Sequence, residues 1–143
     1  MTAKELMIGD WVLTLDSTHK EKVFAQVDAI EEGKHSILVT SECSNWFVDV
    51  GWIESIPITA EILEKNGFVA NKHVYPYQYY EYINEEDKLK IGFAFPQGNK
   101  TSYKEPWVYI DSENVLIVHL PCIYVHQLQH ALRLCGITRE III

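Results

Sequence analysis

The sequence predicts an α+β protein that is mostly β, with an N-terminal SH3-like small barrel followed by an antiparallel sheet packed against a C-terminal helix. Three observations support this fold. The first 57 residues contain several short segments in which apolar and polar residues alternate. A second set of such segments lies between residues 74 and 120, and one long helical pattern follows at residues 120–137. We therefore expect two parts, residues 1–57 and residues 58–143, which are compatible with one compact unit.

The first part is expected to contain five short strands. They are predicted at residues 6–15, 23–30, 36–40, 46–50 and 52–56. Trp46 and Phe47, beside Trp52, are candidates for an aromatic groove of the kind that SH3-like barrels use to bind peptides. The alternative is core packing, because a barrel this small has few other large residues to fill it.

The second part is expected to begin with a linking helix at residues 59–66. Thr59 is a good N-cap, and Gly67 followed by Phe68 is a typical helix stop. Strands are then predicted at residues 74–83, 89–95, 107–110 and 115–120, joined as an antiparallel meander with a polar loop at residues 96–106. Residues 139–143 are a candidate last strand, and we expect their apolar I-I-I end to be paired or buried.

Tyrosines dominate the strand predicted at residues 74–83. Alternation places Tyr75, Tyr77 and Tyr79 on one side of it, with Tyr80 and Tyr82 on the other. An exposed row of tyrosines is suited to binding a protein partner, sugars or bases. The alternative is that one row packs beneath the C-terminal helix and the other against the barrel.

The C-terminal helix is predicted to bury one stripe and to expose the opposite side. The helix is expected at residues 121–135, with Pro121 in the first turn and a stop at Gly136, after which Ile137 folds back onto Leu132. The stripe consists of Tyr124, Val125, Leu128, Ala131, Leu132 and Cys135. The polar group consists of His126, Gln127, Gln129, His130 and Arg133, which is either a recognition face or a solvated one.

A metal site on this helix is disfavoured. His126 and His130 have the spacing of two metal ligands, but no third ligand is evident and the charge of Arg133 lies between them. Glycine-rich phosphate loops and nucleophile elbows are absent from the sequence. A minor enzymatic alternative pairs Cys122, with a pKa lowered at the helix start, with His126 as base. The sequence thus predicts a protein without catalytic residues, metal or cofactor.

Cysteine use and hydropathy favour the cytoplasm. The three cysteines, Cys43, Cys122 and Cys135, have no paired spacing and are expected to be small buried hydrophobes. The sequence shows neither a signal peptide pattern nor a membrane span, so we expect no membrane association.

The negative charge is concentrated in the first half. Residues 1–67 carry 5 Lys and Arg against 12 Asp and Glu, a net charge of −7, whereas residues 68–143 carry 7 against 8, a net charge of −1. This balance disfavours nucleic acid as a partner. The leading expectation is a non-enzymatic protein-binding or adaptor module, and the alternative is a nucleic-acid-associated module that uses the second half, with Lys100 and Lys104 in its loop.

Three sequence stretches resemble those of a family of small proteins encoded by Bacteroides-type gut bacteria and by their phages and mobile elements. These stretches are I-G-D-W-V near the start, P-I-T-A-E-I-L-E-K-N-G-F in the middle and Y-V-H-Q-L-Q near the end. The resemblance covers most of the chain and implies a two-part build in a bacterial or phage cytoplasmic setting. It implies no activity and no site residues.

Overall fold

The structure of the chain is a computed structural model that contains two antiparallel sheets and a C-terminal helix. It describes residues 5–31, 35–42, 44–74, 77–84, 89–96, 105–112, 115–137 and 139–143. The prediction of a mostly β, α+β protein is confirmed. Backbone proximity divides the chain into two compact units, Met1–Ile56 with Tyr124–His126, and Pro57–Ile123 with Gln127–Ile143.

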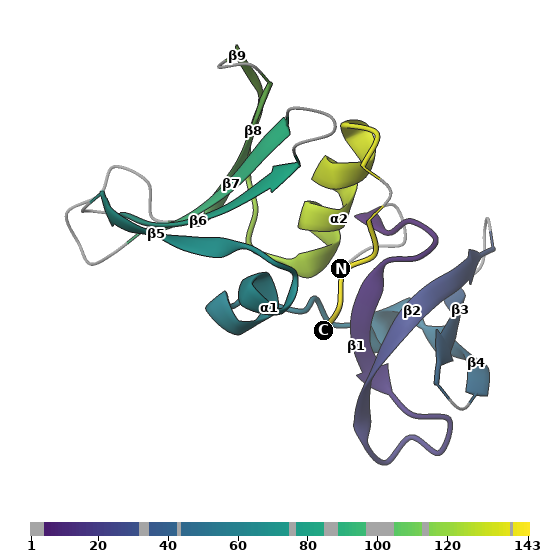
Figure 1. Cartoon of the computed structure of the whole chain (residues 1–143). Helices are drawn as coiled ribbons and strands as arrows, with labels where there is room; N and C mark the ends of the chain where they lie inside the picture. The colour runs from purple at the N-terminus through teal and green to yellow at the C-terminus, as the bar shows by residue number, and fades with distance from the viewer. Residues whose placement is uncertain are drawn as a thin grey trace. The chain divides into compact units, whose positions relative to one another are not determined.

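The first unit is built on a four-stranded sheet in the order β1-β2-β3-β4 (Figure 1). The strands are β1 (Trp11–Leu15), β2 (Lys22–Ile30), β3 (Ser36–Ser41) and β4 (Ser44–Asp49). One face of this sheet is buried because alternate residues are apolar. The core beneath it consists of Leu6, Val12, Ala25, Val27, Ile37, Val39, Val48 and Ile53.

The fifth strand expected at residues 52–56 is reduced to a 3-10 turn and one bridge. The turn is η2 (Val50–Trp52), and the Asp49 carboxylate caps it by accepting a 2.7 Å hydrogen bond from the Gly51 N–H. This local bond draws the chain out of the strand conformation. Glu54 then pairs with Leu13 of β1 through two backbone hydrogen bonds of 2.8 and 3.0 Å.

The second unit is a five-stranded meander with helices. It contains α1 (Ala60–Lys65), β5 (Val69–Val74), β6 (Tyr77–Asn84), β7 (Leu89–Pro96), β8 (Trp107–Ser112), β9 (Val115–Pro121) and most of α2 (Val125–Leu134). The strand order β5-β6-β7-β8-β9 confirms the predicted antiparallel meander. The sheet curves around α2, which covers one of its faces (Figure 1).

Two element boundaries in this unit differ from the prediction. The strand expected at residues 74–83 corresponds mostly to β6. A further strand, β5, precedes it and forms the edge of the sheet. The sequence V-A-N-K-H-V of β5 has no clear alternation, and its first three side chains are exposed. The helix starts at Val125 and not at Pro121, because Pro121 ends β9 opposite Trp107.

Both predicted helix stops are confirmed. Gly67 and Gly136 have φ angles of 78° and 74°, the left-handed region in which glycine carries no steric penalty. After each glycine, the next N–H reaches back to the helix, from Phe68 to the Leu63 carbonyl and from Ile137 to the Leu132 carbonyl, both at 3.0 Å.

The predicted buried stripe of α2 is confirmed at four positions, but the opposite, polar side is not exposed throughout. Val125, Leu128, Ala131 and Leu132 of the expected stripe are buried, but so are His126 and Gln129, each 5% exposed. Tyr124 and Cys135, also expected in the stripe, are half-buried. A helical wheel gives only the angular position of each residue, and we inferred exposure from side-chain polarity. This inference fails for polar side chains that the surrounding structure buries.

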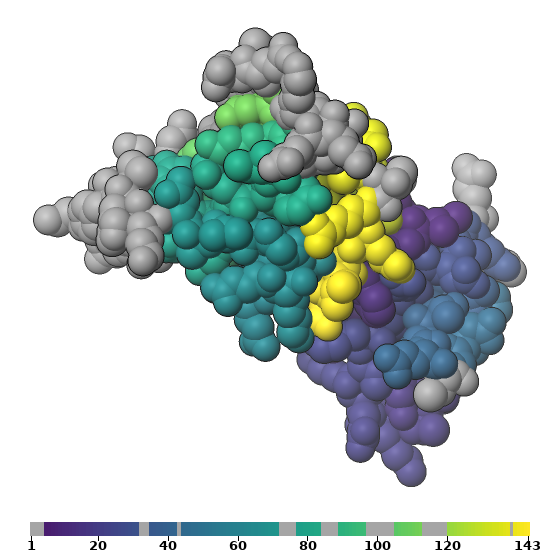
Figure 2. Space-filling model, in the orientation of Figure 1, coloured from purple at the N-terminus to yellow at the C-terminus, as the bar shows by residue number. Residues whose placement is uncertain are grey.

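The C-terminal segment is anchored by one buried side chain and not by a strand. The Asn66 amide, which is 1% exposed, donates to the Ile142 carbonyl at 2.7 Å and accepts from the Ile142 N–H at 2.9 Å. It also donates to the Ile62 carbonyl at 2.8 Å. Ile141 is 2% exposed, so the expectation of a paired or buried end is confirmed. In Figure 2 the C-terminal residues (yellow) lie at the surface beside the teal residues of the second unit.

Replacing Asn66 with alanine is expected to lower the free energy of unfolding by about 2 kcal/mol, because it removes three side-chain hydrogen bonds, two of which hold the backbone of Ile142. Urea denaturation followed by circular dichroism measures this loss. Asn45→Ala, at an exposed position of β4, is the control and should change the stability little. Equal effects of the two substitutions would contradict the anchoring role.

Candidate functional site

The uncovered side of the second sheet carries a cluster of aromatic rings, which we call the aromatic face. Its rings are Tyr77, Tyr79, Trp107 and Tyr109, all half-buried. Strand register explains their common side, because Tyr79 and Trp107 lie opposite Ala94 from the two neighbouring strands. The alternate residues face α2 and include buried Phe93.

A glycine at the centre of the sheet makes room for one of these rings. Tyr109 of β8 lies opposite Gly92 of β7, which lies opposite Glu81 of β6. A Cβ atom added to Gly92 would lie 1.8 Å from the Tyr109 Cζ atom. The Tyr109 ring therefore lies directly over the glycine, and its hydroxyl donates a 2.6 Å hydrogen bond to the Glu81 carboxylate.

The other rings surround Tyr109 at steep angles. The Tyr79 and Trp107 rings lie 6.4 and 5.4 Å from it, inclined by 71° and 46°. Tyr79 meets Trp107 edge to face at 6.0 Å above the small Ala94, and Tyr77 meets Trp107 in the same way at 6.1 Å. Such contacts stabilise a sheet face while leaving ring surfaces toward solvent.

Glu81 and Lys90 of the aromatic face are paired with each other. Glu81 accepts hydrogen bonds from Lys90 at 2.7 Å, from Tyr109 and from Asn71 at 3.0 Å. Burial opposes its negative charge, but these hydrogen bonds more than offset burial and lower the pKa of Glu81. Burial, followed by the bond to Glu81, raises the pKa of Tyr109 far above its ordinary value.

Two apolar side chains and two hydroxyl groups complete this surface. Val69 and Ile83, which share the side of Glu81 and Lys90, are 70% and 63% exposed. In the part of the chain that the structure describes, the hydroxyls of Tyr77 and Tyr79 have no hydrogen-bond partner. The surface therefore offers rings, aliphatic groups and hydroxyl groups around the paired Glu81 and Lys90.

Of the predicted tyrosine row, Tyr77 and Tyr79 lie on the aromatic face. Tyr80 is 8% exposed and contacts Phe95 on the opposite side, where Tyr82 contacts Phe68. The alternation of the two rows is therefore confirmed. Tyr75 lies outside the described residues.

Trp46 has a largely structural position in the first unit. Its ring packs against the core, and its indole N–H donates to the Leu15 carbonyl at 3.1 Å. Trp52 is 47% exposed and meets the His19 ring edge to face at 4.9 Å, whereas Phe47 is 56% exposed on the outer side of β4. The predicted groove residues thus divide between core and surface.

The five predicted residues of α2 do not form one open surface. His126 and Gln129 are buried, and Gln127, His130 and Arg133 are half-buried. His126 stacks on Tyr124 at 5.8 Å, and the Gln127 amide oxygen accepts the Ile123 N–H at 2.8 Å, which caps the helix.

The proposed activation of Cys122 is overturned. Cys122 is 1% exposed, and burial raises its pKa to about 12, so it is a thiol at neutral pH and not a nucleophilic thiolate. Cys135 is half-buried, and its pKa is also raised by burial. Cys43, which was also expected to be buried, lies outside the described residues.

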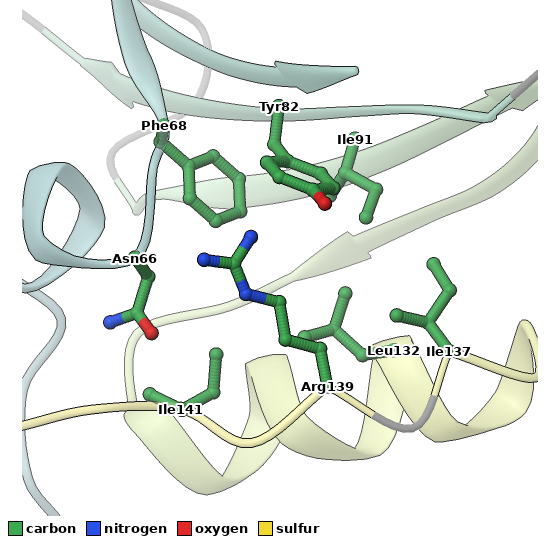
Figure 3. Close-up of a pocket in the computed structure, with 8 residues that line it drawn as sticks. All are labelled: Asn66, Phe68, Tyr82, Ile91, Leu132, Ile137, Arg139 and Ile141. Carbon is green, nitrogen blue, oxygen red and sulfur yellow. The ribbon is translucent and has the colours of Figure 1, made fainter. Parts of the chain in front are cut away.

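Within the described ranges, no metal centre is found. No three His, Cys, Asp or Glu side chains there lie close enough to hold a metal ion. A hollow beside α2 is lined by Phe68, Tyr82 and Arg139, whose guanidinium lies 4.7 Å from the Tyr82 ring centre (Figure 3). Its free space of about 10 Å³ suits no more than a water molecule.

Sequence reasoning missed Trp107, Tyr109 and Gly92 as parts of the site. Trp107 and Tyr109 have the i, i+2 spacing of residues on one strand face, and glycine within a strand is a signal of close approach. Their contact with the tyrosines of β6 depends on the order of the strands in the sheet. Residue spacing within one strand does not predict that order.

We expect Gly92→Ala to lower the free energy of unfolding by about 1 to 3 kcal/mol, because the new methyl group displaces the Tyr109 ring. In a Tyr109→Ala background the same change should be neutral or stabilising, since alanine suits a strand better than glycine does. Denaturant titration of the four proteins measures this cycle. Additive losses would contradict the packing of Tyr109 over Gly92.

Glu81 is expected to make stability depend on pH. Its hydrogen bonds lower its pKa in the folded protein, so its contribution is present above the unfolded pKa and is lost as pH falls through the folded pKa. The urea midpoint of the wild-type protein should therefore fall more between pH 6 and pH 3 than that of Glu81→Gln. Parallel pH profiles would show that the pairing contributes nothing.

Two further findings concern the length of the described helices and the comparison of the chain with known proteins. None of the described helices is long and apolar enough to cross a membrane. Comparison of the chain with models of protein families, with curated proteins and with solved structures found no match.

Proposed function

We propose that the protein is a non-enzymatic protein-binding module and that the aromatic face is its contact surface. The observation that carries this proposal is the pairing of Glu81 with Lys90, Tyr109 and Asn71 within that face. A docking partner would cover rings and aliphatic groups without separating Glu81 from its bonding partners, and leaving a buried charge without partners is what destabilises an interface.

The composition of the face supports a protein partner. Tyrosine and tryptophan are enriched at protein interfaces because a rigid ring contributes a large contact area with little loss of entropy. Val69 and Ile83 extend the apolar surface beside the rings. The helix α2 packs on the opposite face of the sheet, and on this face Val69 and Ile83 are more than half exposed.

The nucleic-acid alternative has less support. Lys90 is the one cation among the described residues of the aromatic face, and it is already paired with Glu81, while Asp111 adds a negative charge on the same side. Binding to a phosphate backbone requires several free cations. Lys100 and Lys104 of the proposed basic loop lie outside the described residues.

We further propose that the first unit is an SH3-like barrel. The succession of four antiparallel strands, a 3-10 turn and a short segment that pairs with β1 supports this fold. Nuclear Overhauser contacts between Leu13 and Glu54, and between the sheet edges, test whether the barrel closes. From the sequence resemblance, we propose that the module acts in the cytoplasm of a bacterium or its phage.

Site-specific photo-cross-linking tests the contact surface. A benzoylphenylalanine residue at Ile83 or Val69, in the host bacterium, should trap a defined protein. The same residue at Leu134, which is 76% exposed on α2, is the matched control.

A trapped protein specific to Ile83 and Val69 supports the proposal. Equal cross-linking from Leu134, cross-linking to nucleic acid alone, or no product from the aromatic face would contradict it.

A further inference from the structure

We infer that Asn66 is a site of spontaneous deamidation, that the fold protects it while Ile142 is bound, and that the modification releases Ile142 irreversibly. This inference does not depend on the proposed function, because Asn66 and Ile142 lie outside the aromatic face. It is carried by the order of two residues in the sequence, by the backbone geometry between them and by the hydrogen bonds of the Asn66 amide.

The pair Asn66–Gly67 has the chemistry of a deamidation site. The backbone nitrogen of the residue after an asparagine can attack the side-chain carbonyl carbon to form a cyclic succinimide, and its proton leaves with the side-chain nitrogen as ammonia. Water then opens the ring to aspartate or isoaspartate. Glycine hinders this attack least, because it has no side chain and the freest backbone. Asn66–Gly67 is the one Asn-Gly pair in the sequence.

The folded chain holds the reacting atoms apart. The ψ angle of Asn66 is 14°, so the Gly67 nitrogen nearly eclipses the backbone nitrogen of Asn66, whereas ring closure requires it to eclipse the Cβ atom. The Gly67 N–H also donates to the Glu64 carbonyl at 3.0 Å, as part of the helix stop. Attack therefore requires the last turn of α1 to open and the Asn66 backbone to rotate.

The segment that Asn66 anchors also holds the Asn66 side chain in place. Two of the three hydrogen bonds of this amide go to the backbone of Ile142, and the third goes to the Ile62 carbonyl. Figure 3 shows the side chain pointing toward this segment, beside Ile141. Opening of residues 139–143 breaks the two bonds to Ile142 and frees the amide, so the rate of deamidation should follow the frequency of this local opening.

The product cannot restore the anchor. Deamidation replaces the NH2 donor of Asn66 with an oxygen atom, which would lie against the carbonyl oxygens of Ile62 and Ile142 that now accept hydrogen bonds at 2.8 and 2.7 Å. Acceptors that face one another repel, and a carboxylate at a position only 1% exposed is destabilised by burial. Isoaspartate also adds a carbon atom to the backbone directly before Gly67. The change is therefore one-way.

Release of Ile142 would uncover an apolar part of the second unit. The neighbouring Ile141 is 2% exposed. It lines the hollow beside α2 together with Phe68, Tyr82 and Leu132. Loss of this cover exposes apolar side chains, and opened regions of this kind are where proteases and aggregation act. The deamidated chain is therefore expected to be cleaved faster than the intact one.

Peptide mass spectrometry of the full chain, incubated at mildly alkaline pH, measures deamidation of Asn66. We expect a slow reaction in the folded protein and a fast one in urea, where the pair is unrestrained. Ile142→Pro removes the N–H that Asn66 binds, so it should accelerate the reaction about tenfold while circular dichroism shows a folded chain. Ile142→Ala keeps this N–H and changes a side chain that is 59% exposed, so this matched control should react at the wild-type rate.

Hydrogen exchange tests the release. After incubation, ion exchange separates the deamidated chain from the intact one by its added negative charge. In the deamidated chain, and in Asn66→Asp, the Ile142 amide should exchange at least about tenfold faster than in the intact chain. The amide of Phe93, on the middle strand β7 that is paired on both sides, should keep its protection.

Three results would overturn the inference. They are equal deamidation of Asn66 in the folded and the urea-unfolded chain, no acceleration by Ile142→Pro, and an Ile142 amide that stays protected after deamidation. Loss of protection at Phe93 together with Ile142 would also overturn it, because it would show unfolding of the whole unit and not release of one segment.

Discussion

The second unit depends on one steric condition, the absence of a side chain at Gly92. It allows the Tyr109 ring to cross the middle strand and to reach Glu81, two strands away from its own backbone. The ring thus ties β8 to β6 over β7 with a hydrogen bond added to the sheet ladder. Tyr79 and Trp107 then pack around this fixed ring, so the arrangement of the whole aromatic face follows from the glycine.

The same bond determines the electrostatics of the face. Glu81 is partly withdrawn from water, which opposes its charge, yet three donors keep it ionised. The result is a surface on which the carboxylate of Glu81 is paired with Lys90 and with two further hydrogen-bond donors. Covering a carboxylate that is already paired costs less free energy than covering a free one, and this property connects the packing of Tyr109 with the proposal of a protein partner.

The candidate site was predictable in part. Tyr77 and Tyr79 were identified because alternation in a strand is a local property, and it correctly separated them from Tyr80. The α2 group was less well predicted. His126 and Gln129 are polar and were expected to face solvent, but both are buried, because enclosure depends on what surrounds a residue and not on its own polarity.

The sequence by itself determined the local features: the alternating strands of the meander, the helix stops at Gly67 and Gly136, and the burial of Ile141 in the I-I-I end. Each of these follows from interactions between residues close in the chain or from hydrophobicity alone. Only the tertiary structure decided that Asn66 would hold Ile142 and that Tyr109 would lie over Gly92. These contacts join separate segments, and their geometry is set by strand order and register, which no local pattern encodes.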